Sequence, residues 1–125
     1  MNSEQIIGKL VKTGKWDRVH ADRCLRANFK CEYCGKDLLS SVENFKEWQE
    51  DHIVPKSKGG DNSDSNIAVS CRTCNVDVKS RWNPLDVVGG NPSREDLIAA
   101  CRHYISVKRS DLLTEVLSFR KIIYS

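Results

Sequence analysis

The sequence predicts one small α+β domain, in which a short two-stranded centre lies between helical flanks and is held together by a metal clamp. Three observations predict this class. The chain has 125 residues, which is the usual size of a single domain. Its residues are 39% hydrophobic and 30% charged, so the core is modest and a bound metal would add stability that the core lacks. Four of its six cysteines form two closely spaced pairs.

The flanks, residues 1–28 and 86–125, are expected to be helical. Near the start, Ser3 can cap a helix that ends at Gly14, and a second helix is expected over residues 17–28, where apolar residues recur at helical spacing.

Two helices are expected in the second flank. Ser93 and Asp96 fit a capping box that opens a helix running to about Lys108, and Ser110 can cap a last helix. The apolar stripes of these two helices can pack either in the core or against a partner, so the sequence is consistent with a monomer or a homodimer.

The centre of the domain, about residues 29–85, alternates between extended and helical patterns. We expect, in order, an extended segment over 45–54, a loop over 56–65, a short buried strand over 66–70 and a short helix over 72–81. No linker or repeat interrupts the chain, so residues 1–125 are expected to form one domain.

The two cysteine pairs indicate a zinc clamp. Cys31 and Cys34 form one pair, Cys71 and Cys74 form the other, and each has a gap of two residues. Two such pairs supply the four thiolates that a tetrahedral zinc ion prefers, with no position left open, so this zinc would be structural. The alternative is that the cysteines are free or form disulfides. Cys24 and Cys101 have no paired neighbour, which makes them candidate core residues.

Charge and hydropathy limit the class of protein further. No apolar run is long enough for a membrane span, and no secretory signal opens the chain, so a reducing cytoplasmic location is expected. The net charge of +3 is uneven: residues 1–30 carry seven Lys and Arg against three Asp and Glu, whereas residues 31–64 carry four against eight. Basic flanks around an acidic centre are consistent with a protein that binds a polyanion at its edges and a cation in its middle. Charged helix faces that are merely exposed to solvent would give the same pattern.

Between the cysteine pairs lies an ordered series of polar motifs. Asp-His-Ile-Val-Pro occupies 51–55, Lys-Ser-Lys-Gly-Gly follows at 56–60, and Asn66 and Asn75 come later. In order and spacing this series resembles the HNH endonuclease family, over about residues 29–85. The resemblance implies a ββα-metal core, also called a His-Me finger, and cleavage of DNA phosphodiester bonds.

Phosphodiester hydrolysis needs a base for water and a cation for the phosphate. His52 suits the base, and Asp51 and Asn75 offer oxygen ligands for Mg²⁺ or Mn²⁺. The resemblance implies the same roles and adds that Asn66 orients the imidazole. Asn75 stands where the family name has a second His, which makes this the HNN variant. Because neighbours in a strand point to opposite faces, Asp51 and His52 can share a phosphate only where the strand ends or distorts.

Helical spacing places Arg72, Asn75 and Lys79 on one face of the helix over 72–81. The candidate phosphate contacts are therefore cations of this helix and of the preceding loop, namely Lys56, Lys58, Arg72, Lys79 and Arg81.

The sequence thus favours a metal-dependent DNA endonuclease that nicks one strand at each active site. Two other classes remain open: a non-catalytic zinc module that binds nucleic acid, and a zinc domain that binds another protein. Both leave the polar motifs between the cysteine pairs without a role.

Overall fold

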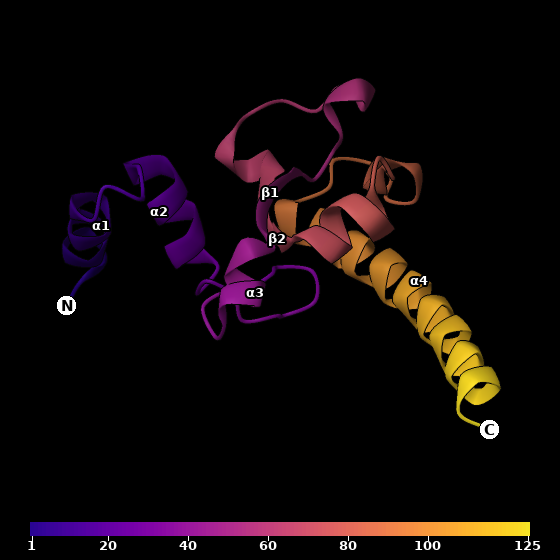
Figure 1. Ribbon diagram of the computed structural model, residues 1–125. Helices are drawn as coiled ribbons and strands as arrows, with labels where there is room; N and C mark the ends of the chain where they lie inside the picture. The colour runs from indigo at the N-terminus through magenta and orange to yellow at the C-terminus, as the bar shows by residue number, and fades with distance from the viewer.

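The computed structural model describes all residues, Met1–Ser125. Two helices, α1 and α2, lie at the N-terminal end, a two-stranded sheet lies in the centre, and one long helix, α4, projects from the body toward the C-terminus (Figure 1). The chain has no helix with the length and apolar character that a membrane span requires.

The first two predicted helices are confirmed. Helix α1 spans Ser3–Lys12, and its cap is Asn2 rather than Ser3, because Asn2 and Gln5 form a capping box. Helix α2 spans Arg18–Arg26 and is capped by Asp17. It buries Ala21 and Cys24, so the prediction of Cys24 as a core residue is confirmed.

The predicted extended segment is only half strand. Its first residues belong to a short helix, α3 (Val42–Lys46), which Ser41 caps, and strand β1 spans Trp48–His52. Strand β1 pairs in antiparallel register with β2 (Ile67–Cys71), with Trp48 opposite Cys71 and His52 opposite Ile67. All five residues of β2 are buried, as its apolar pattern predicts.

The loop between the strands contains two short 3₁₀ turns, η1 (Lys56–Lys58) and η2 (Asp64–Asn66), and a further 3₁₀ turn, η4, follows at Pro84–Asp86. After β2 comes η3 (Thr73–Lys79), which is a π-helix and not an α-helix. The backbone N–H of Ser80 donates to the carbonyl of Asn75, five residues back. This wider turn changes which side chains share a face, so Lys79 lies with the buried Cys74 rather than with exposed Arg72.

One helix replaces the two that were predicted near the C-terminus. Helix α4 runs unbroken over Arg94–Ile123 and begins with the expected capping box of Ser93 and Asp96. The expected second start at Ser110 is wrong. The helix contains no Gly or Pro, and a Ser inside a helix costs only a few tenths of a kcal/mol.

The hydrophobic core joins α2, β2, η3 and the first half of α4. It contains three cysteines of the clamp, and also Cys24 and Cys101, both fully buried. The prediction of Cys101 as a core residue is thus confirmed as well. Because three of the four clamp cysteines lie inside this core, an ion bound to the four sulfurs would also stabilise the domain.

Candidate active site

The four paired cysteines converge as their spacing predicts. Their Sγ atoms all lie within 4.8 Å of one another, and those of Cys34 and Cys71 are 3.8 Å apart. Four sulfurs bound at about 2.3 Å to a tetrahedral zinc ion would be about 3.8 Å apart. The cluster of Cys31, Cys34, Cys71 and Cys74 is therefore compatible with a zinc site.

The crowded sulfurs have strongly separated proton affinities. Hydrogen bonds from the other three cysteines, above all from Cys31, hold the pKa of Cys34 below its usual range. The equivalent contacts raise the pKa of Cys74, and again Cys31 is the largest cause. Four such thiols cannot all ionise without a compensating cation, and zinc supplies that charge when it displaces their protons.

The side chain of Glu47 links the two halves of the cluster. One carboxylate oxygen accepts a hydrogen bond from Lys36, just after the first cysteine pair, at 2.6 Å. The other oxygen accepts hydrogen bonds from the backbone N–H and the hydroxyl of Thr73, inside the second pair. Lys36 is the largest cause of a lowered pKa of Glu47, so this carboxylate stays ionised near neutral pH.

The predicted base and both predicted ligands of the catalytic metal line one surface cavity of about 470 Å³. Strand β1 ends at His52, which lets Asp51 and His52 face the same space, as a shared phosphate requires. Asn75 reaches this cavity from η3. The remaining lining is polar apart from one proline, and consists of Glu50, Pro55, Lys56, Ser57, Ser80 and Arg81.

Asp51 is buried and held on one side only. Its Oδ2 accepts a hydrogen bond from the hydroxyl of Tyr33 at 2.6 Å and lies 3.0 Å from Nζ of Lys79, whereas its Oδ1 accepts no hydrogen bond from the protein. Burial raises the pKa of Asp51, and the charge of Lys79 opposes that rise. One oxygen thus remains for a ligand in the cavity.

Asn75 is fixed in a similar way. Its side-chain Nδ2 donates to Oε1 of Gln49 at 2.8 Å, which orients the amide group, and its side-chain Oδ1 accepts no hydrogen bond within the protein. A carboxylate oxygen and an amide oxygen that line one polar cavity suit a hard divalent cation such as Mg²⁺ or Mn²⁺. The residues present therefore fit the catalytic metal that the sequence predicts.

The ring of His52 has a partner that the sequence analysis missed. Its Nε2 lies 2.8 Å from Oδ1 of Asn62, and its Nδ1 makes no hydrogen bond within the protein. Asn62 lies in the exposed loop between the strands, ten residues after His52, and no spacing rule marks it. Because Oδ1 only accepts hydrogen bonds, Nε2 carries the proton and Nδ1 carries the lone pair.

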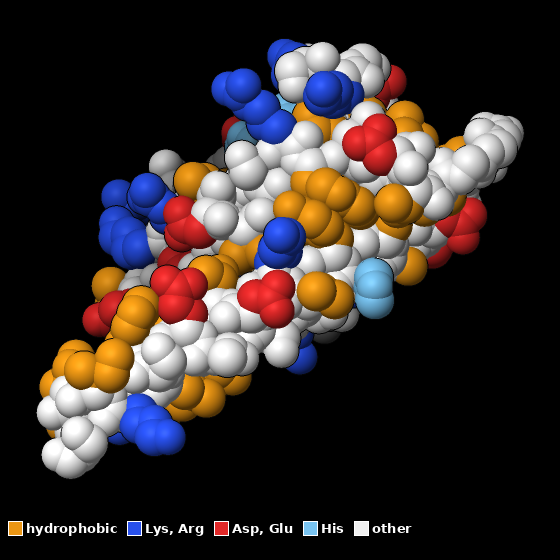
Figure 2. All heavy atoms as spheres, turned by 90° about the vertical axis from the view of Figure 1, so that its right-hand side faces the viewer, with side chains coloured by type: hydrophobic (Ala, Val, Ile, Leu, Met, Phe, Trp, Pro, Cys, Tyr) orange, Lys and Arg blue, Asp and Glu red, His pale blue; other side chains and the backbone are white.

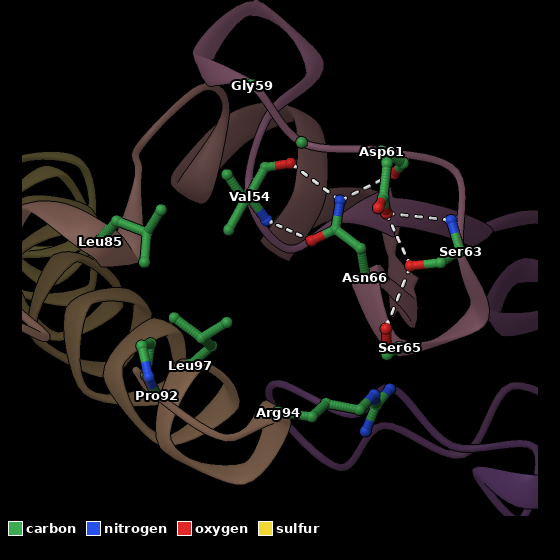
Figure 3. A pocket seen from close by; sticks show the side chains of 11 residues that line it. Val54, Gly59, Asp61, Ser63, Ser65, Asn66, Leu85, Pro92, Arg94 and Leu97 are labelled. Carbon is green, nitrogen blue, oxygen red and sulfur yellow. Dashed lines mark hydrogen bonds between the residues drawn. The ribbon is translucent and has the colours of Figure 1, made fainter. Parts of the chain in front are cut away.

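Asn66 holds the backbone of this loop rather than the imidazole itself (Figure 3). Its Oδ1 accepts from the N–H of Val54 at 2.9 Å, and its amide nitrogen donates to the carbonyls of Val54 and Asp61. The loop passes so close that a Cβ on Gly60 would lie 1.8 Å from the carbonyl oxygen of Val54. Asn66 therefore shapes the loop that carries Asn62, and its influence on His52 is indirect.

The candidate phosphate contacts separate into three groups. Lys56 and Arg81 are exposed and line the cavity, whereas Lys58 and Arg72 are exposed outside its lining. Lys79 requires a correction, because its side chain is fully buried and cannot reach a DNA backbone. It donates instead to the main-chain carbonyl of His52 at 3.2 Å, besides pairing with Asp51.

Comparison with known proteins agrees with the geometry of this segment. Residues 31–81 match the family model described as HNH endonuclease. No curated protein and no solved structure matches the chain. The matched segment begins at the first cysteine of the clamp and contains every residue that lines the cavity, so the match to the HNH endonuclease family covers the whole candidate site.

Proposed function

We propose that the chain is a metal-dependent DNA endonuclease that hydrolyses one phosphodiester bond at each active site. One observation carries the proposal: His52, Asp51 and Asn75 line the same cavity, and each keeps one ring nitrogen or side-chain oxygen free of hydrogen bonds within the protein. These are the groups that phosphodiester hydrolysis needs, a base for water and ligands for a cation.

His52 serves as the general base. Asn62 fixes the proton on Nε2, so that Nδ1 can take a proton from a water molecule that attacks phosphorus. The imidazolium that forms keeps Nε2–H on Asn62, whose carbonyl dipole stabilises the new charge. Lys79 holds the carbonyl of His52 and thereby fixes the end of β1 on which the ring is mounted.

Asp51 and Asn75 would hold a hard divalent cation, Mg²⁺ or Mn²⁺, through their free oxygens. When bound, such an ion supplies positive charge that stabilises the phosphate and the leaving oxygen. Lys79 and Tyr33 occupy the other oxygen of Asp51, and this fixes the orientation of its carboxyl group.

Exposed cations at the rim would hold the DNA backbone. Lys56 and Arg81 line the cavity, which makes them the first candidates for contacts with the phosphates beside the cleaved bond. Lys58 and Arg72 would contact more distant phosphates. We propose that zinc in the cysteine cluster is structural, because its closed shell has no position for water or substrate.

Plasmid cleavage tests the proposed activity. Supercoiled plasmid incubated with the chain and Mg²⁺ or Mn²⁺ should become open circular before any linear form appears, because one site cuts one strand. His52→Ala should abolish cutting, whereas His103→Ala, which changes an exposed histidine of α4, should cut like the wild type. If the plasmid stays supercoiled with both metals, the proposal is refuted.

DNA binding separates this function from that of a non-catalytic nucleic-acid-binding module. The endonuclease proposal predicts that His52→Ala binds duplex DNA as tightly as the wild type in a gel-shift assay at low salt while it fails to cut. If the wild type binds DNA without cutting it, and His52→Ala changes neither property, the chain is a non-catalytic nucleic-acid-binding module.

A further inference from the structure

Helix α4 continues its core-facing side far beyond the body of the molecule. Ile98 and Ile105 are 5% and 1% exposed, because they pack into the core. The next residues at the same seven-residue spacing are Leu112 and Phe119, and they are 47% and 50% exposed. The same apolar repeat is therefore buried in the core along the first half of the helix and exposed along the second half.

This bare side is large. Figure 2 shows hydrophobic side chains gathered along the projecting end of the molecule. We call it the α4 face; its exposed hydrophobic residues are Leu112, Leu113, Val116, Leu117, Phe119, Ile122, Ile123 and Tyr124. Together they expose on the order of 800 Å² of side chain, which exceeds the largest apolar patch of a typical monomer and equals one partner's share of a standard interface.

We propose that the α4 face binds the α4 face of a second copy of this chain, with the two helices antiparallel. In this pairing Val116 of one copy packs against Phe119 of the other, and Leu112 packs against Ile123. Both contacts occur twice because the pair has two-fold symmetry, so the same patch on each copy forms the whole interface.

The position of the body selects the antiparallel arrangement. The body packs on the same side of α4 at Ile98, Cys101 and Ile105 that carries the α4 face further along. In a parallel pair, both bodies would lie between the two helices at the same end and would collide. Because α4 projects well clear of its own body (Figure 1), each body in an antiparallel pair would lie beyond the end of the other copy's helix.

Antiparallel packing also opposes the dipoles of the two helices, which favours this orientation over the parallel one.

A groove at the base of the projection would receive the end of the second helix. It has a volume of about 540 Å³ and lies between the first cysteine pair and α4, with Tyr33, Ile105 and Leu113 among its lining residues. When Leu112 faces Ile123 of the second copy, residues 122–124 of that copy reach this groove. The end of the helix would then be covered as well.

The oligomeric state tests the interface without any measurement of nuclease activity. Light scattering after gel filtration, at about 100 μM zinc-loaded protein, should give twice the chain mass of 14.2 kDa. Val116→Lys should give the single-chain mass and raise the dissociation constant at least tenfold. Thr114→Lys, on the opposite side of the same helix, should stay dimeric. A wild-type mass of one chain, or an unchanged dimer of Val116→Lys, would overturn the proposal.

A charge-pair variant tests the orientation. Phe119→Glu alone should also be monomeric, but a chain with both Val116→Lys and Phe119→Glu should dimerise again, because antiparallel packing sets the introduced lysine against the introduced glutamate. Parallel packing would instead set like charges together. A double variant that stays monomeric would overturn the antiparallel arrangement, and circular dichroism of each variant checks that α4 remains helical.

Discussion

Replacement of Asn66 by Asp would test how the loop between the strands is held. The substitution keeps the shape of the side chain and its acceptor for the N–H of Val54, but it replaces the amide donor with a second acceptor. That oxygen would face the carbonyls of Val54 and Asp61, at the 3.1 Å and 2.9 Å where the amide now donates. Because Asn66 is only 8% exposed, water cannot relieve the conflict.

The cost follows from these contacts. Two lost hydrogen bonds cost about 1 kcal/mol each, and the carbonyls left without a donor in a buried site cost about 1–3 kcal/mol more. We therefore expect Asn66→Asp to lower the free energy of unfolding by about 3–5 kcal/mol at pH 7. A protonated carboxyl group can donate once, so the deficit should be small at low pH and should grow as the pH rises through the raised native pKa of the new carboxyl.

Urea unfolding followed by circular dichroism measures this deficit. Wild type and Asn66→Asp are compared at pH 7 and at pH 4.5, each with the wild type at the same pH as its reference. Asn62→Asp is the matched control, because Asn62 is exposed and should cost less than about 0.5 kcal/mol. If Asn66→Asp unfolds within about 0.5 kcal/mol of the wild type at pH 7, the assignment of Asn66 to the loop backbone fails.

Three further predictions concern the same domain. Gly60→Ala should lower the free energy of unfolding in urea by at least about 2 kcal/mol, because its Cβ would lie 1.8 Å from a carbonyl oxygen. Gly89→Ala is the control, because it has open space around it. Equal losses in the two variants would contradict the close approach at Gly60. Glu47→Gln should cost about 0.5–1 kcal/mol at pH 7, a small value because the ion pair with Lys36 is partly exposed. The native pKa of Glu47 is lowered from 4.5, so this contribution is complete above pH 4.5 and is lost as the pH falls through the lowered value; a cost that does not change with pH would disprove it. Removal of zinc by a chelator, or Cys74→Ala, should abolish the cooperative thermal transition seen by circular dichroism, and a variant with the wild-type melting temperature would refute a structural metal.

Local signals predicted the parts of the fold that depend on neighbouring residues. Ser93 caps α4 as its capping box predicts, α2 begins one residue after the predicted start at residue 17, and the apolar run after Asn66 is the buried strand. Helix ends and short strands depend on contacts within a few residues, which a single sequence displays. The break expected at Ser110 was wrong because a possible cap begins a helix only when the residues before it leave the helix.

The site was predictable only to the level of residue types. The motifs between the cysteine pairs identified His52, Asp51 and Asn75, and the structure brings all three to one cavity. Asn62 and the burial of Lys79 were not predictable. The first depends on how a ten-residue loop folds back, and the second depends on a π-helix whose wider turn no residue pattern announces.

The sequence by itself determined the metal clamp, the polar motif and the helical flanks, because each is written in the identity and spacing of nearby residues. Only the tertiary structure decided which nitrogen of His52 is free, which oxygen of Asp51 is free, and that Lys79 supports the site rather than the substrate. It also decided that half of α4 projects with its hydrophobic side uncovered. These properties depend on which residues meet across the fold, and hydrogen bonds and burial between distant segments leave no periodic trace in the chain.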